Sequence, residues 1–270
     1  IDLTGPWKRT QSDDDAHALF RDAFGWPSDF EARPVQEAMV DAAKACAAPS
    51  LIILEAETGV GKTEAALAAA QVIAASVDAQ GVYFAAPTMA TANGLLERTM
   101  NWARNTTETG AVSSLYLAHS KNQLSKPFRD LRFRDINEDA DDPSTNGEVV
   151  ASSWMSGRRR GLLSNIVVGT VDQVLMLALR QRYSMLRHAA LAGKIIIFDE
   201  IHSYGAYTSD YLATTLEWLA HYGATVIMMS ATLPSAEREK LIEAYTGNSV
   251  EEHSDAYPLI TVASENSLRY

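Results

Sequence analysis

The chain has 270 residues, of which 47% are hydrophobic, and a formal net charge of -11 at pH 7. This apolar content excludes a disordered chain, and the length favours one large domain over two small ones. The negative charge excludes a protein whose whole surface coats nucleic acid, because such binding needs many Lys and Arg side chains facing phosphates. Any contact with a phosphate backbone is therefore expected to be local.

Cysteine content and hydropathy indicate the compartment. Cys46 is the single cysteine, so no intramolecular disulfide can form, and no Cys/His cluster has the spacing of a zinc site. The N-terminal residues lack the apolar core of a signal peptide, and no run approaches the ~20 apolar residues of a membrane span. We expect a soluble, cytoplasmic protein that makes no membrane contact.

Short β-branched runs alternate along the chain with longer amphipathic stretches. The predicted strands are residues 51–55, 81–86, 112–118, 165–168, 194–199, 224–229 and 258–262. The predicted helices are residues 33–47, 62–76, 88–104, 170–181, 207–221 and 234–246. Near-continuous apolar strands indicate a parallel sheet buried on both faces, and the alternation predicts right-handed βαβ crossovers. The expected fold class is a three-layer α/β domain with a mostly parallel sheet.

The expected domain covers residues 30–250, after an extension or linker at 1–29 and before a tail at 251–270. The acidic stretch at about 121–148 interrupts the alternation of strands and helices. Its composition predicts a flexible, solvated insertion.

Residues 51–63 read LIILEAETGVGKT, an apolar strand that leads through a glycine-paired loop into a helix. Backbone N–H groups at such a helix start can cradle phosphates, because the dipole and the unpaired donors both favour anions. Lys62 is expected to reach the β- and γ-phosphates of a nucleoside triphosphate, and Thr63 to ligate Mg²⁺. A glycine-rich connector is the alternative. The predicted nucleotide-contacting residues of this loop are Thr58, Gly59, Val60, Gly61, Lys62, Thr63 and Glu64.

The strand KIIIFD delivers two carboxylates, Asp199 and Glu200, at its C-terminal end. Ligands of open α/β sheets bind at that edge. We therefore expect both carboxylates beside the glycine-paired loop at residues 56–63, the phosphate loop. Asp199 is predicted to hold Mg²⁺, and Glu200 to orient and polarise an attacking water. His202 is either a loop histidine with a satisfied hydrogen bond or a link between the nucleotide and motion.

One strand further, Ser230 and Thr232 follow the apolar run VIMM. Hydroxyls at a strand end can bond the carboxylates of the neighbouring strand, and so could pass a change at the γ-phosphate along the sheet edge. We therefore group both residues with His202 as candidate coupling residues.

The three motifs, A-x-T-G-x-G-K-T, D-E-x-H and S-A-T, in this order resemble the first RecA-like domain of superfamily 2 helicases. Upstream, FEARPVQ at residues 30–36 resembles their Q motif, in which a glutamine reads the adenine edge. The resemblance implies that the nucleotide is ATP and that Gln36 selects it. A polar residue near a helix start is the alternative reading of Gln36.

APTMATAN at 86–93 and GTVDQVL at 169–175 resemble the strand-contacting motifs of that superfamily. Each begins at a strand end and starts a helix, where N–H groups and Thr oxygens can bind phosphate. Helix capping by the two threonines is compatible with that role. The candidate contacts to nucleic acid here are Thr88, Asn93, Thr170 and Gln173.

SSWMSGRRRGLL holds the one dense basic patch with a nearby aromatic side chain, Trp154. Arg158 and Arg159 in this patch suit the backbone of a single strand, as does the neighbouring Arg160. An exposed, charged connector without a ligand is the alternative.

WMSGRRRGLLSNIVVGTVDQVLM, GKIIIFDEIHSYGAYTSDYL and MMSATLP together resemble the helicase region of the CRISPR-associated helicase-nuclease of type I interference systems. The resemblance runs from about residue 30 to residue 234. It implies an ATP- and Mg²⁺-dependent translocase on single-stranded DNA, recruited by a crRNA-guided surveillance complex and acting with an HD nuclease. It thus implies a role in antiviral defence.

The chain also departs from that family. It has no His-Asp dipeptide, and its six histidines form no metal-ligand array, so the HD nuclease and the second RecA-like domain are expected outside this chain. Gly205 stands where the family leads us to expect an acidic residue. Two alternatives remain open: a helicase-like ATPase that acts on RNA or remodels a complex, and a nucleotide-dependent interaction module. Glu200 argues against the second alternative, because binding alone does not require that carboxylate.

Overall fold

The computed structural model describes residues 15–46, 49–77, 79–109, 111–118, 148–150, 160–180, 182, 184–204 and 206–270. Across these residues the centre of the fold is a sheet of nine strands in the order β4-β3-β5-β2-β6-β7-β1-β8-β9. Neighbours from β4 to β1 run parallel, whereas β8 is antiparallel to β1 and β9 is antiparallel to β8. The strands are β1 Leu51–Glu55, β2 Gly81–Ala86, β3 Val112–Ala118, β4 Glu148–Val150, β5 Ile166–Thr170, β6 Lys194–Phe198, β7 Val226–Ser230, β8 Leu259–Ser264 and β9 Ser267–Arg269.

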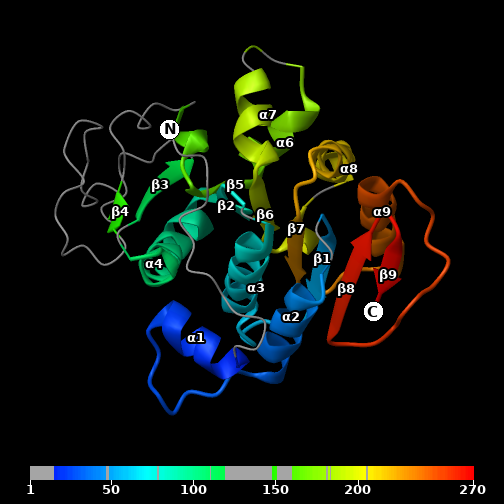
Figure 1. Ribbon diagram of the computed structural model, residues 1–270. Coiled ribbons are helices and arrows are strands. Elements are labelled where there is room, and N and C mark those ends of the chain that lie inside the picture. The colour runs from blue at the N-terminus through cyan, green and yellow to red at the C-terminus, as the bar shows by residue number, and fades with distance from the viewer. Residues whose placement is uncertain are drawn as a thin grey trace.

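Helices cover both faces of the sheet (Figure 1). Helices α1 to α4 lie on one face and α6 to α8 on the other, with α9 packed against α8. This arrangement confirms the predicted three-layer α/β fold. No helix within the described ranges combines the length and the apolar character needed to cross a membrane. The α-helices are α1 Ala16–Phe24, α2 Pro34–Lys44, α3 Lys62–Val77, α4 Met89–Thr106, α6 Val171–Leu175, α7 Ser184–Ala192, α8 Ala206–His221 and α9 Ser235–Thr246, and the 3₁₀ turns are η2 Arg160–Leu163, η3 Met176–Ala178 and η4 Ile201–Ser203.

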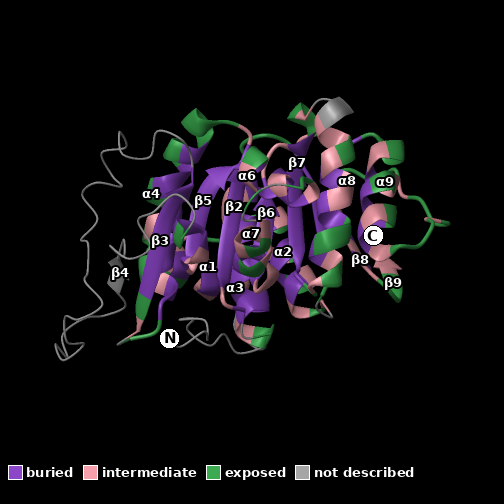
Figure 2. Cartoon of the chain, turned by 90° about the horizontal axis from the view of Figure 1, so that it is seen from above, coloured by how far each residue is buried: buried purple, intermediate pink, exposed green. Residues whose placement is uncertain are grey.

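The central strands read as apolar runs because both of their faces are covered. Every residue of β1, β2, β5, β6 and β7 is buried, as the continuous purple sheet in Figure 2 shows. In β8, by contrast, buried and half-buried positions alternate, as expected for a strand covered on one face. Alanine-rich α3 is buried along most of its length, since its small side chains let it lie close to the sheet.

The predicted helix at 170–181 is wrong in its extent. Strand β5 continues to Thr170, which pairs with Ala86 of β2, and the helix that follows ends after five residues. A 3₁₀ turn follows, and then α7, which the sequence did not reveal. Gly169 permits the longer pairing, because a Cβ at that position would lie 2.3 Å from the hydroxyl of Tyr83. Tertiary crowding therefore requires glycine at this position of the strand.

Two segments outside the predicted domain core also pack into the fold. Helix α1 lies within the segment read as an extension or linker, and its Phe20 is fully buried and stacked on Trp26 at 6.0 Å. Asn105 of α4 donates from Nδ2 to the Ala23 carbonyl at 3.2 Å. Strands β8 and β9 lie within the segment read as a tail, and β8 pairs with every residue of β1.

The burial of Phe20 gives α1 a measurable share of the stability. Phe20→Ala is expected to lower the free energy of unfolding by about 3–5 kcal/mol, the usual cost of emptying a buried aromatic site. Urea denaturation followed by circular dichroism measures the change. The matched control is Met185→Ala, at a residue that is 79% exposed, which is expected to change stability by less than about 0.5 kcal/mol. Equal effects of the two substitutions would contradict the packing role of α1.

Candidate nucleotide-binding site

The candidate site residues gather where the parallel strands end. Strand β7 lies between β6 and β1, with Glu55 of β1 opposite Ser230 and Phe198 of β6 opposite Met228. The residues that follow these strands therefore meet at one edge of the sheet. This is the edge at which open α/β sheets bind ligands.

The loop after β1 turns sharply at two glycines. Gly59 and Gly61 have φ values of +88° and +89°, in the left-handed region that glycine adopts without strain. At Gly61 space is also limiting, because a Cβ would lie 2.4 Å from Nε2 of Gln36. Helix α3 begins at the next residue, so its unpaired N–H groups lie beside the loop. These features place backbone N–H groups where phosphates are expected, and phosphate binding by the loop stays a prediction.

The Lys62 ammonium is held inside this loop. Its Nζ donates to the carbonyl oxygens of Ala56 at 2.7 Å and Glu57 at 3.1 Å, and the residue is only 7% exposed. A cation is thereby fixed among backbone dipoles where phosphates are expected. Of the other predicted residues, Thr58 is exposed, Val60 and Thr63 are half-buried, and the Glu64 carboxylate lies 3.5 Å from Arg98 Nη1.

Residues at the start of α2 make hydrogen bonds to the loop that follows β1. Arg33 donates from Nη1 to the Gly59 carbonyl at 2.5 Å. Gln36 is buried, accepts from the Arg33 backbone N–H at 3.0 Å and donates from Nε2 to the Gly61 carbonyl at 3.5 Å. These contacts are those of a polar residue near a helix start. The reading of adenine by Gln36 stays a prediction.

Asp199 follows β6 directly, and its backbone N–H donates to the Ala85 carbonyl at 3.0 Å. Burial, with a smaller contribution from the charge of Glu200, raises the pKa of Asp199 to about 6, whereas the Lys62 charge opposes the shift. The Tyr204 hydroxyl donates to the Asp199 carbonyl at 2.9 Å. These contacts hold the backbone at Asp199, and its carboxylate lies in a partly desolvated place where the Lys62 charge favours the charged form.

Glu200 adopts a backbone conformation that is uncommon outside glycine. Its φ is +54°, in the left-handed region, where a side chain costs of order 1 kcal/mol or more. From this position Oε2 lies 3.2 Å from Nε2 of His202. The sheet edge therefore holds a strained residue at the position predicted to activate water.

His202 connects Glu200 to β7. Its Nδ1 lies 3.1 Å from Oγ of Ser230, and Ser230 donates to the Thr232 carbonyl at 2.6 Å. The structure thus brings the three candidate coupling residues into one chain of contacts, and their coupling role stays a prediction.

The donor chemistry of the edge fits Mg²⁺ shared with phosphates. In the part of the chain that the structure describes, no group of three or more His, Cys, Asp or Glu side chains could hold a metal alone. Mg²⁺ commonly takes only one or two protein oxygens beside substrate phosphates and water. The hydroxyl of Thr63, in the first turn of α3, and the carboxylate of Asp199 are oxygen donors of that kind.

The candidate contacts to nucleic acid lie on other strand ends of the same edge. Thr88 is exposed and caps α4, since its Oγ1 accepts from the Thr91 N–H at 3.2 Å, and Asn93 is exposed on that helix. Thr170 is buried at the N-cap position of α6 but forms no side-chain cap bond. Gln173 accepts from Arg187 through its side-chain oxygen at 3.3 Å. Capping is thus observed for Thr88 and not for Thr170.

Some predicted features lie outside the described residues. These are Trp154, Arg158, Arg159, Gly205 and nearly all of the insertion at 121–148. Arg160 is described and is exposed at the start of η2.

Sequence reasoning missed two residues that support the site, Arg33 and Tyr204. Arg33 lies in the predicted Q motif, but its contact with Gly59 spans 26 residues of chain. Tyr204 follows the D-E-x-H motif and contacts the backbone of Asp199. The contact of Arg33 depends on how distant segments fold together, whereas the contact of Tyr204 depends on the conformation of the turn η4 between it and Asp199.

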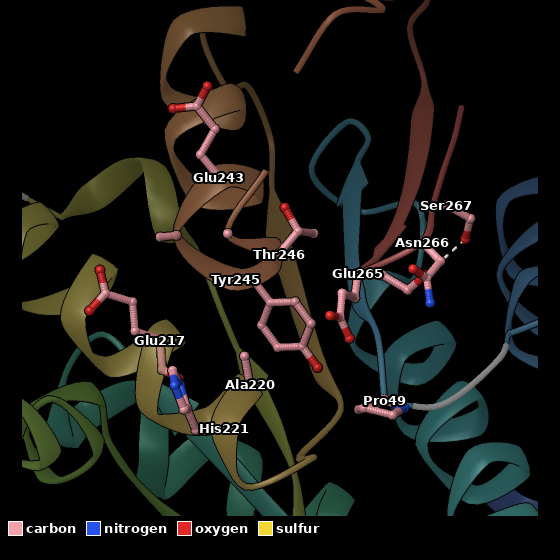
Figure 3. Close-up of a pocket in the computed structure, with 13 residues that line it drawn as sticks. Pro49, Glu217, Ala220, His221, Glu243, Tyr245, Thr246, Glu265, Asn266 and Ser267 are labelled. Carbon is pink, nitrogen blue, oxygen red and sulfur yellow. Dashed lines mark hydrogen bonds between the residues drawn. The ribbon is translucent and has the colours of Figure 1, made fainter. Parts of the chain in front are cut away.

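A separate cavity of about 690 Å³ lies between α8, α9 and the β8–β9 hairpin (Figure 3). Pro49, just before β1, and Gly247, just after α9, line it, so it lies at the opposite end of β1 from the phosphate loop. Glu217, Glu243 and Glu265 also line it, and three carboxylates disfavour phosphate. The phosphate loop therefore remains the candidate nucleotide site.

The sheet order, the loop after β1 and the carboxylates at the sheet edge define a RecA-like domain. In agreement, the family model of the DEAD/DEAH box helicases matches residues 33–241. The chain therefore belongs to the DEAD/DEAH box helicase family.

Within this family, the chain is similar to CRISPR-associated Cas3 proteins. It is 39% identical over 259 residues to the nuclease/helicase Cas3 of Streptococcus thermophilus, covering 92% of this chain and 27% of that protein. It is 35% identical over 232 residues to the endonuclease/helicase Cas3 of Thermus thermophilus, covering 86% of this chain and 25% of that protein. The resemblance read from the motifs is confirmed. The chain spans about a quarter of the length of these relatives.

Solved structures agree with this placement. A crystal structure of T. fusca Cas3-AMPPNP matches with a TM-score of 0.76 and 29% identity, over 93% of this chain and 28% of that chain. A chain of a CRISPR RNA-guided surveillance complex in a pre-nicking state matches with a TM-score of 0.56 and 26% identity, over 84% of this chain and 23% of that chain. The predicted RecA-like fold is confirmed.

The raised pKa of Asp199 makes stability depend on pH. Since the folded pKa of about 6 lies above the ordinary value of 3.8, this group favours the folded state most at low pH, and that benefit is lost as pH rises through 6. Asp199→Asn removes the buried charge and is expected to raise the melting temperature at pH 8 by about 6–12 °C, because a carboxyl whose pKa rises from 3.8 to about 6 on folding costs ~3 kcal/mol when ionised. Calorimetry without nucleotide measures it.

The comparison at pH 4 supplies the control. There the wild-type carboxyl is protonated in the folded state, so Asp199→Asn is expected to leave the melting temperature nearly unchanged. A gain that is the same at pH 4 and pH 8 would contradict the assignment of the shift to Asp199.

Proposed function

We propose that this chain is the ATP-binding motor half of an ATP-dependent single-stranded DNA translocase or helicase in CRISPR interference. The observation that carries the proposal is the Lys62 ammonium held inside the loop after β1, at the same sheet edge as Asp199. Membership of the DEAD/DEAH box helicases supports ATP as the nucleotide. Similarity to T. fusca Cas3-AMPPNP, which is named with a triphosphate analogue, supports it further.

Each residue at this edge of the sheet has a separate proposed role in phosphoryl transfer to water. Lys62 and the N–H groups at the start of α3 bind and orient the β- and γ-phosphates. Mg²⁺, with Thr63 and Asp199 as its protein ligands, would neutralise the charge of the phosphates when bound. Glu200 accepts a hydrogen bond from the attacking water and takes up its proton. Gln36 is proposed to select adenine.

His202, Ser230 and Thr232 are proposed to report the state of the γ-phosphate to the rest of the motor. Their contacts lead from Glu200 across to the end of β7. A change in the position or charge of Glu200 would alter its contact with His202, and through it the segment after β7. This path supports coupling between hydrolysis and movement.

The proposed partners are single-stranded DNA and a crRNA-guided surveillance complex. Thr88 and Thr170 stand at the ends of the neighbouring strands β2 and β5, a placement that suits contact with a phosphate backbone. The match to a chain of the surveillance complex supports the second partner. An HD nuclease domain and a second RecA-like domain, both outside residues 1–270, belong to the proposed complete machine.

Nucleotide binding is the first test. Lys62→Ala is expected to weaken MgATP binding by about a hundredfold or more, because it deletes the cation that faces the β- and γ-phosphates. Isothermal titration calorimetry measures the affinity, and circular dichroism checks the fold. Lys240→Ala, at an exposed lysine of α9, is the matched control and is expected to bind like wild type. Equal affinity in the Lys62 and Lys240 variants would refute the assignment of the loop.

Turnover is the second test. Residues 1–270 alone are expected to bind MgATP but to hydrolyse it roughly a thousandfold more slowly than the complete motor, because an arginine finger from a second domain commonly supplies such a factor. Single-stranded DNA or RNA is expected to change this slow rate little, since stimulation requires a second domain to close on the nucleotide. A phosphate-release assay measures both.

Adding the second RecA-like domain should restore turnover and its stimulation by DNA. Stimulation by RNA alone would replace the DNA translocase with an RNA-directed motor. Brisk hydrolysis by residues 1–270, abolished by Lys62→Ala, would show a self-sufficient ATPase instead.

A further inference from the structure

A buried ion pair joins the end of β1 to α9. Nη1 of Arg238 donates to Oε1 of Glu55 at 2.7 Å, and the two side chains are only 7% and 6% exposed. Glu55 is the last residue of β1, and Arg238 lies in the first turn of α9. Removing both charges from water is costly, and an apolar pair of similar size often serves stability as well or better. We therefore expect the pair to act mainly by fixing the position of β1 relative to α9, and less by adding to the stability of the fold.

The Glu55 carboxylate is bound from the segment that follows Thr232. The backbone N–H of Leu233 also lies near it, and together with the guanidinium it opposes the rise in the pKa of Glu55 that burial causes. Both donors thus come from the stretch that leads from the candidate coupling residues into α9. The carboxylate therefore fixes the end of β1 to that stretch through directional, charge-assisted bonds.

The Arg238 guanidinium reaches a third element as well. Its Nη2 donates to the Ser254 carbonyl at 2.8 Å, in the segment that leads to β8. In the same segment the Tyr257 hydroxyl donates to the Ala231 carbonyl at 2.9 Å. The pair thus lies where the end of β1, the stretch after β7 and the approach to β8 meet.

The position of Glu55 bears on the phosphate loop through the next residue. The Ala56 N–H donates to the Ser230 carbonyl at 3.1 Å, and the Ala56 carbonyl accepts from Nζ of Lys62 at 2.7 Å. A shift of the chain at Glu55 would therefore move the oxygen on which the Lys62 ammonium rests. A misplacement of about 1 Å is enough to weaken a site of this kind.

We propose that Glu55 and Arg238 are positioning residues for the nucleotide. Their ion pair sets where the chain leaves β1, and so holds the phosphate loop in register with the segment after Ser230. Neither side chain touches the phosphates in this scheme; both act through Ala56 and Lys62. The inference rests on the proposed function, because it assigns the pair to the same nucleotide site.

The test separates positioning from stability. Single removal of either charge leaves the other buried and unpaired, so the main variant is Glu55→Gln with Arg238→Met, which keeps an acceptor for Leu233 and the volume of the long side chain. Melting temperature and MgATP affinity are measured for this variant and for wild type, with calorimetry well below both melting points. The double variant is expected to melt within about 4 °C of wild type. It is expected to bind MgATP about tenfold more weakly.

Two further variants complete the design. Arg238→Lys keeps the buried cation but cannot serve Glu55 and Ser254 together in the same geometry, and is expected to bind with intermediate affinity. Arg21→Met is the matched control. Arg21 also donates to backbone carbonyls, those of Ser28 and Phe30, but it belongs to α1 and takes no part in the contact between β1 and α9. It is expected to bind MgATP like wild type even where it lowers the melting temperature.

Each of the following results would overturn the positioning role of Glu55 and Arg238. Wild-type affinity in the folded double variant overturns the positioning role while leaving the proposed function intact. If neither the double variant nor Arg238→Lys folds, the pair serves stability, and this result also overturns the inference. If wild type itself binds no MgATP, the proposed function fails and the inference fails with it.

Discussion

The parallel pairing of β1 with β7 and of β7 with β6 is the constraint on which the site depends. It places Glu55 opposite Ser230, and it brings the phosphate loop, Asp199 and the Ser230–Thr232 segment to one edge of the sheet. The pairing continues one residue beyond the strand, through the bond from Ala56 to Ser230. Close packing on both faces favours this register, because a slip by one residue would exchange the side chains that pack against the helix layers on either side.

The site concentrates charge in a chain that is acidic as a whole. Local positive potential comes from one buried ammonium and from backbone N–H groups, so the net charge of -11 does not prevent anion binding at this edge. The neighbouring carboxylates have the opposite effect. Burial beside Glu200 raises the pKa of Asp199, and the nearby Lys62 offsets part of that cost. Bound phosphates and Mg²⁺ would supply the negative and positive charges that complement those of the protein at this edge.

Several features at the edge oppose stability and are held in place by the core. Glu200 has a left-handed backbone, Asp199 is partly dehydrated, and Glu55 and Arg238 form a buried ion pair. Each costs free energy locally, and such costs commonly gather at functional sites. The fully buried strands beneath them supply the offsetting apolar burial. The pattern is that of a rigid sheet carrying a strained edge.

The sequence by itself determined the three-layer fold, most strands and the order of the motifs, because apolar periodicity and glycine spacing are local properties. It did not reveal α1 or α7, and it extended the helix after Thr170 too far. Nor could it show that Arg33 holds Gly59, or that Glu55 meets Arg238 across 183 residues of chain. Those contacts follow from how strands and helices pack at one edge, which only the tertiary structure decides, because contacts between distant segments leave no periodic signal.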